Sequence, residues 1–345
     1  MFRARHAVAT TVVALALSGC GAASTSVSPA STGGSVGSEL TVYNAQHEDL
    51  VAEMVAGFTA ATGIKVTLRN GDDSELGNQL AQEGKASPAD VFLTENSPAM
   101  DLVDQAGLFA PLPSTTLGQV PPQFVPGTKN WTGWAARATV FAYSPTKVAA
   151  ASLPASLMDL AKPEWKGRFG VSPGGADFQA IVSAVLTLEG ADKTQAWLDA
   201  LKVNAKVYEG NGAIMKAVNA GQVDAGVIYH YYWYKDRAES GANSKNVELH
   251  YFGKQDSGAF VSVSGAGVLA SSRRSEAAQK FVQYLSGPAG QQILTKSTAL
   301  EYAIGNGVTP NPALKPLAEL QAPTVDPGSL NGATVVQMLQ KSGLI

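Results

Sequence analysis

Residues 40–68 read LTVYNAQHEDLVAEMVAGFTAATGIKVTL. The first five residues alternate between apolar and polar side chains as a strand does, and residues 48–61 place apolar side chains at helical spacing. After Thr62-Gly63 the residues 64–68 alternate again, which predicts a second strand. A strand, a helix and a strand in this order form a parallel pair covered by the helix, so the stretch predicts an α/β fold.

The same alternation of short strands and helices continues beyond this unit. A helix is predicted over residues 73–83, a strand over 90–93 and a helix over 98–105. This βαβαβα order predicts a mainly parallel sheet with helices on both faces. Further on, residues 134–143 and 259–269 are predicted to be two long strands, each linking one sheet to another as in a two-lobed hinge protein.

The middle of the chain predicts a second sheet. It is expected to begin with residues 156–160 and 166–171. Two glycines, Gly265 and Gly267, are expected to bend the second long strand at the hinge. Further helices are predicted over residues 178–188, 194–203, 214–220 and 276–285, and a proline-rich region completes the chain.

The N-terminal residues are predicted to be a targeting segment rather than part of the fold. A basic start and a short apolar stretch precede the tetrapeptide LSGC at 17–20, which matches the bacterial lipobox, in which the cysteine is lipidated. We therefore expect a signal peptide over residues 1–19, and a lipidated Cys20 with a flexible tether over residues 20–38. Cys20 is the only cysteine, so no disulfide is expected in the exported domain.

The remaining chain, from Glu39 to Ile345, is long enough for two ordinary lobes. The formal net charge is −3 and the lysines and arginines are scattered, so a nucleic-acid partner is not expected. No stretch after residue 20 is long and apolar enough to be a transmembrane helix. The sequence also lacks the motifs of serine hydrolases, zinc proteases, P-loop NTPases and dinucleotide-binding enzymes.

Residues 226–234, GVIYHYYWY, combine the end of an apolar strand with four tyrosines, a tryptophan and a histidine. The residues that follow are polar and favour a helix, so the aromatic side chains are expected where a strand gives way to a helix. Open α/β sheets bind ligands at such carboxyl ends of strands. A lone aromatic cluster is also consistent with core packing, and the choice between the two depends on other residues.

Four candidate site residues share this position in the predicted sheets. His47 follows the first strand, Glu95 follows the third, and Tyr231 and Tyr232 follow a strand of the second sheet. Taken singly, His47 could be a surface residue that opens a helix, Glu95 could stabilise a helix N-terminus, and the tyrosines could pack in the core. Together, an imidazole, a carboxylate and two phenols form a hard, oxygen-rich metal site of the kind that Fe(III) prefers.

The formal charges of these groups favour a trivalent ion. Two phenolates and one carboxylate carry three negative charges, which neutralise Fe³⁺ when the imidazole binds as a neutral group. Phenols, whose ordinary pKa is about 10, ionise at neutral pH only where a strong cation replaces the proton. Zn²⁺ more usually takes histidine and cysteine, and Ca²⁺ needs more carboxylate and carbonyl oxygens. Four protein ligands leave about two octahedral positions for water or a small anion.

Several stretches of the sequence match a known family. They are VYNAQH at 42–47, PADVFLTE at 88–95, KPEWKG at 162–167, YYWY at 231–234, QDSGA at 255–259 and SGA at 264–266. On these stretches the chain resembles the bacterial ferric ion-binding proteins, the binding proteins of iron(III) ABC importers. The resemblance extends from residue 40 to the C-terminus. It implies a class II periplasmic-binding-protein fold of two α/β lobes, each a mixed, mainly parallel sheet flanked by helices, joined by two hinge strands.

The resemblance also implies which residues bind iron. The metal ligands of the family correspond to His47, Glu95, Tyr231 and Tyr232. The family's exogenous anion lies at a turn before a helix, where backbone N–H groups favour an anion. The residues implied for a synergistic small anion, or for water in its place, are Ser172, Gly174, Gly175, Ala176, Asn211 and Arg137.

This chain departs from the family pattern in two places. Tyr229 and His230 precede the tyrosine pair, where family members often carry two asparagines. Gly174 stands where they carry a serine in the anion turn, and Asp177 follows as an extra carboxylate. A carboxylate there would repel an anion unless it is paired, and Arg137 is the expected partner. Tyr229 and Asp177 are therefore kept as additional candidate site residues.

We therefore expect a monomeric, lipid-anchored protein on the extracytoplasmic face of the cell membrane. It is expected to bind Fe(III) between its lobes and to deliver it to an ABC permease, without catalysis. Lobe 1 is predicted to comprise residues 39–136 and 260–308, and lobe 2 residues 137–259 and 309–345. The main alternative is a binding protein of the same fold for a small organic cation or a phosphonate, of the thiamine or polyamine kind. A metal-dependent hydrolase with Asp177 as its base is the other alternative.

Overall fold

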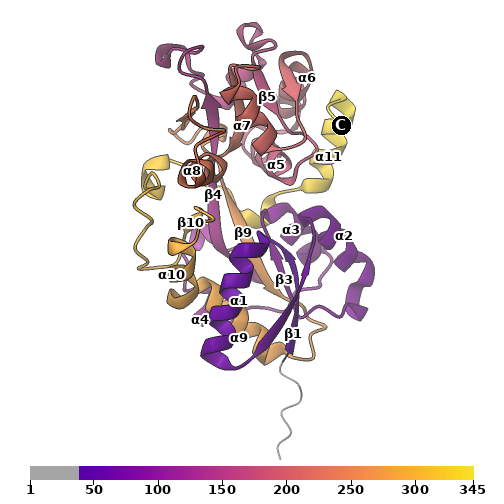
Figure 1. The fold of residues 1–345 in the computed structure, drawn as a ribbon. Coiled ribbons are helices and arrows are strands. Elements are labelled where there is room, and N and C mark those ends of the chain that lie inside the picture. The colour runs from indigo at the N-terminus through magenta and orange to yellow at the C-terminus, as the bar shows by residue number, and fades with distance from the viewer. Residues whose placement is uncertain (1–38) are drawn as a thin grey trace, which may run out of the picture. The chain divides into compact units, whose positions relative to one another are not determined.

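The structure is a computed structural model that describes residues 39–345 (Figure 1). The predicted signal peptide, Cys20 and the tether lie outside these residues. Strands and helices alternate along the described chain, as the sequence predicts, and the sheets are flanked by helices. Within this part of the chain, no helix has the length and apolar character needed to cross a membrane.

The first lobe is built on a sheet with the strand order β2-β1-β3-β9-β4. β1 pairs in parallel with β2 and β3, whereas β9 is antiparallel to both β3 and β4. We define this lobe by the first part of β4 and by the elements β1 (Glu39–Ala45), α1 (Glu48–Thr62), β2 (Lys65–Asn70), α2 (Asp73–Glu83), β3 (Val91–Thr94), α3 (Ser97–Gln105), α4 (Ser114–Leu117), β9 (Val261–Val268), α9 (Ser275–Ser286), α10 (Pro288–Lys296) and β10 (Tyr302–Ala303).

Alternate side chains of β1 enter two different cores. Leu40 and Val42 pack in the cluster that contains Phe58 of α1 and Phe281 of α9. Tyr43, on the opposite face, packs in the cluster formed with α2 and α3. Figure 1 shows α1 and α9 on one side of β1 and β3, and α2 and α3 on the other. The period-2 alternation of the sequence therefore produces a sheet that is covered on both faces.

The second lobe continues the strand order as β4-β7-β5-β6. β5 is parallel to β6 and β7, and β4 is antiparallel to β7. We define this lobe by the second part of β4 (Trp131–Tyr143 in full) and by β5 (Phe169–Val171), α5 (Ala176–Glu189), α6 (Ala191–Asn204), β6 (Ala205–Val207), α7 (Asn211–Asn219), β7 (Ala225–Tyr229), α8 (His230–Glu239), β8 (Glu248–His250) and α11 (Gly332–Ser342).

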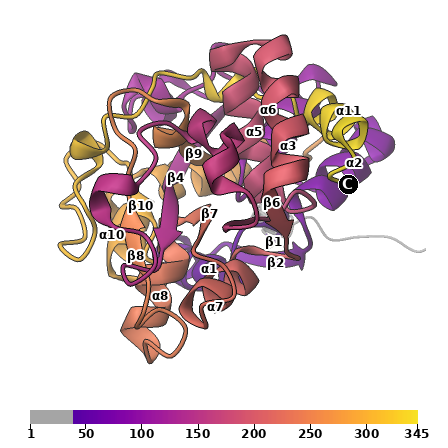
Figure 2. The same ribbon diagram turned by 90° about the horizontal axis from the view of Figure 1, so that it is seen from above.

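Helices also cover both faces of the second sheet. Phe141 and Phe169 pack in the core that α5, α6 and α11 share, and Figure 2 shows these three helices side by side. Val140 and Ile228 face the opposite way and pack against Ile214 of α7. Neighbouring residues of β4 thus belong to different cores in the second lobe as well, because side chains alternate between the two faces of a strand.

β4 is the strand that pairs with strands of both lobes. Up to Ala138 it pairs with β9, and from Thr139 onward it pairs with β7. At this crossing the N–H of Ala138 is bonded to Nδ1 of His230 at 3.2 Å. The second long stretch, 259–269, also links the lobes as predicted, although the strand itself is β9 and begins only at Val261. β9 pairs with β3 and β4 in the first lobe, whereas Ala259 and Phe260 pack in the second-lobe core and the carbonyl of Phe260 accepts the N–H of Thr139 at 3.0 Å.

Three of the predictions about the fold differ from the structure. The segment predicted to open the second sheet, 156–160, forms a 3₁₀ helix over Leu157–Ala161, whose N-terminus Ser156 caps. The proline-rich C-terminal region ends in α11, a helix that the sequence did not predict. Gly265 and Gly267 lie within the first-lobe sheet rather than at a hinge, opposite β3 and β4. Their missing side chains allow Met100 and Phe109 to approach the strand closely.

The packing role of Gly265 is tested by Gly265→Ala. A Cβ at this position overlaps the Met100 side chain, so we expect the free energy of unfolding to fall by about 1–3 kcal/mol. Gly212→Ala is the control, because a Cβ there meets no atom within 4 Å and the residue lies in α7. That substitution should leave stability unchanged or raise it by up to about 1 kcal/mol. Equal effects in urea denaturation would contradict the packing role.

Candidate metal centre

The four predicted ligands lie at the carboxyl ends of strands from both lobes. His47 follows β1 and immediately precedes α1, where its N–H donates to the side chain of Gln46 at 2.7 Å. Glu95 follows β3. Tyr231 and Tyr232 lie in the first turn of α8, directly after β7. The structure thus places two candidate ligands on each side of the interlobe cleft.

Three of these four side chains meet at Glu95. Tyr231 Oη donates to Glu95 Oε1 at 2.7 Å, and His47 Nε2 lies 3.7 Å from the same oxygen. The rings of His47 and Tyr231 are in edge contact, with centroids 5.1 Å apart. His47 keeps 32% of its side chain exposed and Glu95 keeps 19%, whereas Tyr231 is buried. A surface pocket of about 320 Å³ reaches His47 and Tyr231, and provides a route from solvent.

Tyr232 joins this group through its neighbour and through Asp177. Its ring stacks on that of Tyr231, with centroids 4.3 Å apart. Its hydroxyl lies 3.3 Å from Asp177 Oδ2. The second phenol therefore faces a carboxylate of its own, just as Tyr231 faces Glu95. Both phenol–acid pairs are arrangements in which a cation can replace the shared proton.

Asp177 lies in the first turn of α5, directly after the turn predicted to hold an anion. Asn211 Nδ2 donates to Asp177 Oδ2 at 2.7 Å, and Asn96 Nδ2 donates to Asp177 Oδ1 at 3.0 Å. Asn211, which was predicted to contact the anion, thus contacts this carboxylate. The other residues of the turn are close in the chain: Gly175 donates its N–H to the carbonyl of Ser172 at 3.0 Å, Gly174 is exposed, and α5 begins at Ala176.

Arg137 pairs with Glu301 and not with Asp177, which corrects the predicted pairing. Arg137 Nη2 lies 2.6 Å from Glu301 Oε2, and both side chains are fully buried. Arg137 Nε is also 3.9 Å from Glu95 Oε1. Burial opposes the charge of Arg137, but the carboxylates of Glu301 and Glu95 outweigh it and raise the pKa of the guanidinium above its ordinary range. Among residues 39–345, no other lysine or arginine is fully buried.

Glu301 is a site residue that sequence reasoning missed. β10 pairs with β4 through Tyr302 and Ala136, and this antiparallel register brings Glu301 beside Arg137. Its second oxygen, Oε1, lies 3.3 Å from His47 Nε2. Both of these atoms are buried without a hydrogen-bond partner. No local motif marks Glu301, because its position depends on a strand pair formed across more than 160 residues of chain.

Asp73, the first residue of α2, holds the backbone that carries Glu95. Its carboxylate accepts the N–H of Glu95 and the N–H of Asn96, each at 2.9 Å. Burial, and then the negative charge of Glu95, raise the pKa of Asp73 to about 8. Sequence reasoning missed this residue as well, although an acidic residue at a helix N-terminus is a common pattern.

Tyr229 and His230, the departures from the family pattern, take structural positions. Tyr229 is fully buried, and its hydroxyl donates to Asn96 Oδ1 at 3.3 Å. His230 stacks on Tyr302, with centroids 4.6 Å apart, and is bonded to the crossing point of β4. Burial, and then the charge of Arg137, lower the pKa of His230 to about 3, so the imidazole is neutral at physiological pH.

The two phenols hold their protons strongly in this structure. Burial is the largest cause, and the charges of Asp177 and Glu95 add to it, so that the pKa values of Tyr231 and Tyr232 lie well above the ordinary value. Burial, and then the charge of Glu95, also raise the pKa of Asp177 well above its ordinary value. A bound cation must therefore displace the protons of the two phenols, which are more stable when neutral.

The donor set suits a hard trivalent cation and depends on the tyrosines. Within residues 39–345, no group of three or more His, Cys, Asp or Glu side chains is arranged to hold a metal ion. The tyrosine hydroxyls supply the further oxygens beside His47 and Glu95. Nε2 of His47 is buried without a hydrogen-bond partner, and its lone pair is available to bind a cation. Oxygen-rich sites with one imidazole favour Fe(III) over zinc.

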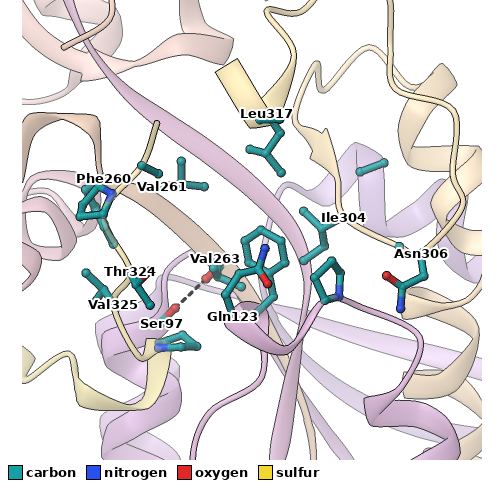
Figure 3. Close-up of a pocket in the computed structure, with 18 of the residues that line it drawn as sticks. Ser97, Gln123, Phe260, Val261, Val263, Ile304, Asn306, Leu317, Thr324 and Val325 are labelled. Atoms are coloured by element: carbon teal, nitrogen blue, oxygen red, sulfur yellow. Dashed lines mark hydrogen bonds between the residues drawn. The ribbon is translucent and has the colours of Figure 1, made fainter. Parts of the chain in front are cut away.

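A separate cavity of about 660 Å³ lies away from this centre (Figure 3). Its walls are formed by Phe260 and Val263 near the crossing, by Ile304, and by Leu317 and Val325 of the C-terminal segment. None of the four predicted ligands lines it. The volume of a cavity is therefore a poor guide to the metal site in this protein.

Comparisons with known proteins agree with the geometry. Residues 40–297 match the family model of the bacterial extracellular solute-binding proteins. The Fe(3+)-binding periplasmic protein of Serratia marcescens is 61% identical over 306 residues, which cover 89% of this chain and 90% of that protein. The major ferric iron-binding protein of Neisseria meningitidis serogroup B is 35% identical and covers 89% of this chain and 93% of its own length.

Solved structures give the same result. The iron-bound HitA protein of Pseudomonas aeruginosa superimposes with a TM-score of 0.83 at 42% identity, over 88% of this chain and 99% of that one. The IdiA (FutA) protein of Trichodesmium, solved with iron and citrate, has a TM-score of 0.78 at 27% identity, with 88% and 99% coverage. The chain therefore belongs to the bacterial extracellular solute-binding proteins and, within them, to the ferric ion-binding protein family.

Proposed function

We propose that this protein captures Fe(III) between its lobes and delivers it to an ABC importer. His47 and Glu95 of the first lobe and Tyr231 and Tyr232 of the second are the proposed ligands. The observation that carries this proposal is the contact of Tyr231 with Glu95 at 2.7 Å beside His47, which joins donors of both lobes at one point. The Fe(3+)-binding and ferric iron-binding relatives support the choice of cargo.

Iron binding in this site is coupled to the loss of the phenol protons and to the closure of the lobes. Iron replaces the protons of the two phenols, because phenolates are strong ligands for a trivalent cation. The ligands come from both lobes, so only a closed arrangement supplies all four to one ion. Release then requires one of three changes. Acid returns protons to the phenolates, reduction of the iron weakens its preference for them, and the permease can separate the lobes. No covalent step is needed, and we propose no catalytic role for Asp177 or any other residue.

We propose that Asp177 takes the place of an exogenous anion. Its carboxylate already receives the side-chain donors of Asn96 and Asn211, which would otherwise be free to hold a small anion. Its contact with Tyr232 brings it to the edge of the proposed iron shell. A second anion in this turn would meet a carboxylate at close range and would be repelled. One remaining position in the shell is then left for water.

We further propose that the mature protein is a monomer, anchored through a lipid on Cys20 to the extracytoplasmic face of the membrane. The lipobox at 17–20 supports the anchor. We also propose the lobe division 39–136 plus 260–308 and 137–259 plus 309–345. The separate cores of the two sheets support this division. The packing of α11 against α5 and α6 supports the assignment of the C-terminus to the second lobe.

The tyrosine ligands are tested by single phenylalanine substitutions. Fe(III) added with a weak chelator should give a visible phenolate-to-iron charge-transfer band. Tyr231→Phe and Tyr232→Phe should each weaken iron retention by more than about 100-fold, because even the loss of a residue that only supports a ligand costs 10–100-fold. Tyr234→Phe, which removes a hydroxyl 3.5 Å from that of Tyr251, is the matched control and should keep the band. Full retention in Tyr232→Phe would instead favour an organic cation stacked on the ring.

The displaced protons give a second prediction. The pKa values of Tyr231 and Tyr232 are raised, so both phenols are protonated before binding and ionised after it. Lowering the pH therefore weakens binding, by about 100-fold per pH unit for two protons. Proton release measured by pH-stat titration, corrected for the iron donor, should fall by about one proton per iron in Tyr232→Phe. An unchanged proton count would exclude ionisation of that phenol.

The role of Asp177 is tested by Asp177→Ala. The unsubstituted protein should load iron equally well with and without added phosphate or carbonate, since its own carboxylate occupies the anion turn. The variant should load poorly in anion-free buffer and recover when a small anion is supplied. Asp199→Ala, an exposed change on α6, is the control and should behave as the unsubstituted protein. Anion dependence in the unsubstituted protein would contradict this role.

A further inference from the structure

Asn96 is a buried amide that contacts both lobes. Its Nδ2 donates to Asp177 Oδ1 at 3.0 Å. Its Oδ1 accepts from Ser262 Oγ at 2.8 Å and from Tyr229 Oη at 3.3 Å. Its backbone N–H donates to Asp73 Oδ2 at 2.9 Å. Only 1% of the residue is exposed, and both polar atoms of its side chain have protein partners.

The segment that carries Asn96 is fastened to β9. Ser97 Oγ donates to the carbonyl of Val263 at 2.9 Å, as Figure 3 shows. Ser264 Oγ donates to the carbonyl of Glu95 at 3.3 Å. Together with the bond from Ser262, three consecutive residues, 95–97, are each held by one of the residues 262–264. Asn96 therefore projects toward the second lobe from a fixed base.

The orientation of the amide follows from its neighbours. Two hydroxyl groups, from Ser262 and Tyr229, point at its oxygen, and a carboxylate from Asp177 faces its nitrogen. A flipped amide would place the Asn96 oxygen against the Asp177 carboxylate, which only accepts, whereas the two hydroxyls can donate to an oxygen or accept from a nitrogen. The surroundings thus select the one orientation in which Nδ2 donates to Asp177.

We propose that Asn96 is a positioning residue that aims the Asp177 carboxylate at the iron when the lobes close. This inference rests on the proposed function. Asn96 from the first lobe and Asn211 from the second each hold one oxygen of Asp177. Asp177 Oδ2 in turn lies 3.3 Å from the hydroxyl of Tyr232. The bond from Asn96 can form only when the lobes are together, so correct placement of this carboxylate and closure become one event.

Asn96→Ala tests this role through iron release. We expect the rate of iron loss to a competing chelator to rise about 10–100-fold, as for other residues that support a ligand. The charge-transfer band should keep its wavelength, because the tyrosine ligands are unchanged. Asn78→Ala is the matched control, since Asn78 is an exposed asparagine on α2 that donates to its own helix. Its release rate should equal that of the unsubstituted protein.

A double-mutant cycle separates positioning from a general structural role. If Asn96 acts through Asp177, then Asn96→Ala should change the release rate less than about twofold in the Asp177→Ala background. If the two effects multiply, or if Asn96→Ala alone leaves release unchanged, the proposal is overturned. Ser262→Ala retains Asn96 but removes its orienting donor, and should raise the release rate about fivefold. This milder variant gives a result even where Asn96→Ala folds poorly.

Failure of the proposed function would be distinguishable from failure of this inference. A protein that binds no Fe(III) would show no charge-transfer band in its unsubstituted form. The coupling between Asn96 and Asp177 is then read in the metal-free protein, from the melting temperatures of the two single variants and the double variant. Additive shifts there would overturn the inference, whereas a double variant that melts no lower than Asp177→Ala would support it.

Discussion

The gathering of several acidic groups around one buried cation governs this protein. Glu95, Asp177 and Glu301 lie between the lobes; Glu301 is fully buried and the other two are partly buried, and Arg137 is the one fully buried lysine or arginine in residues 39–345. Charges that are removed from water must be paired, hydrogen-bonded or neutralised by protons. Glu301 takes the first route through Arg137, Asp177 takes the second through its amide donors, and the two phenols take the third. A trivalent cation replaces the protons in this arrangement and completes the pairing.

The crossing of β4 between the lobes explains why these groups meet. Arg137 precedes the crossing by one residue, and the antiparallel pairing of β10 places Glu301 beside it. Thr139, the first residue beyond Ala138, pairs with Tyr229, which directly precedes α8 and its tyrosines. Residues near one point of one strand therefore organise donors from distant parts of the sequence. A rotation at this point must also separate the two sets of proposed ligands, which links binding to hinge motion.

Much of this arrangement could be predicted from the sequence. The pattern of residues 40–68 predicted the parallel pairing of the first strands, and the carboxyl ends of β1 and β3 indicated His47 and Glu95. Periodicity did not predict the structure where a capping residue or a contact with a distant helix decided it. The apolar run at 157–161 could have been a strand, but Ser156 and its capping box select a 3₁₀ helix. The helix α11 was not predicted because it follows a long proline-rich segment. It packs against α5 and α6, which are far away in sequence.

The supporting residues of the site were beyond such reasoning. Asp73, Asn96 and Glu301 are polar residues without a motif, and each acts through groups that only the folded chain brings near. An asparagine after a strand is ordinary in sequence terms, because the same residue type caps helices and forms turns. Its role here depends on Ser262, a partner 166 residues away. Long-range polar contacts of this kind leave no periodic pattern in the sequence, whereas the apolar faces of helices and strands do.

The two departures from the family pattern can be understood as one change. A carboxylate at position 177 in place of an external anion requires donors at both of its oxygens, and Asn96 and Asn211 provide them. The hydroxyl of Tyr229 donates to the oxygen of the same Asn96 amide and helps to hold that amide in place. A tyrosine before the ligand pair and an aspartate in the anion turn are thus connected through a single amide. Tyr229, one of the two additional candidate site residues, contacts Asn96, which in turn holds the carboxylate that we propose in place of the anion.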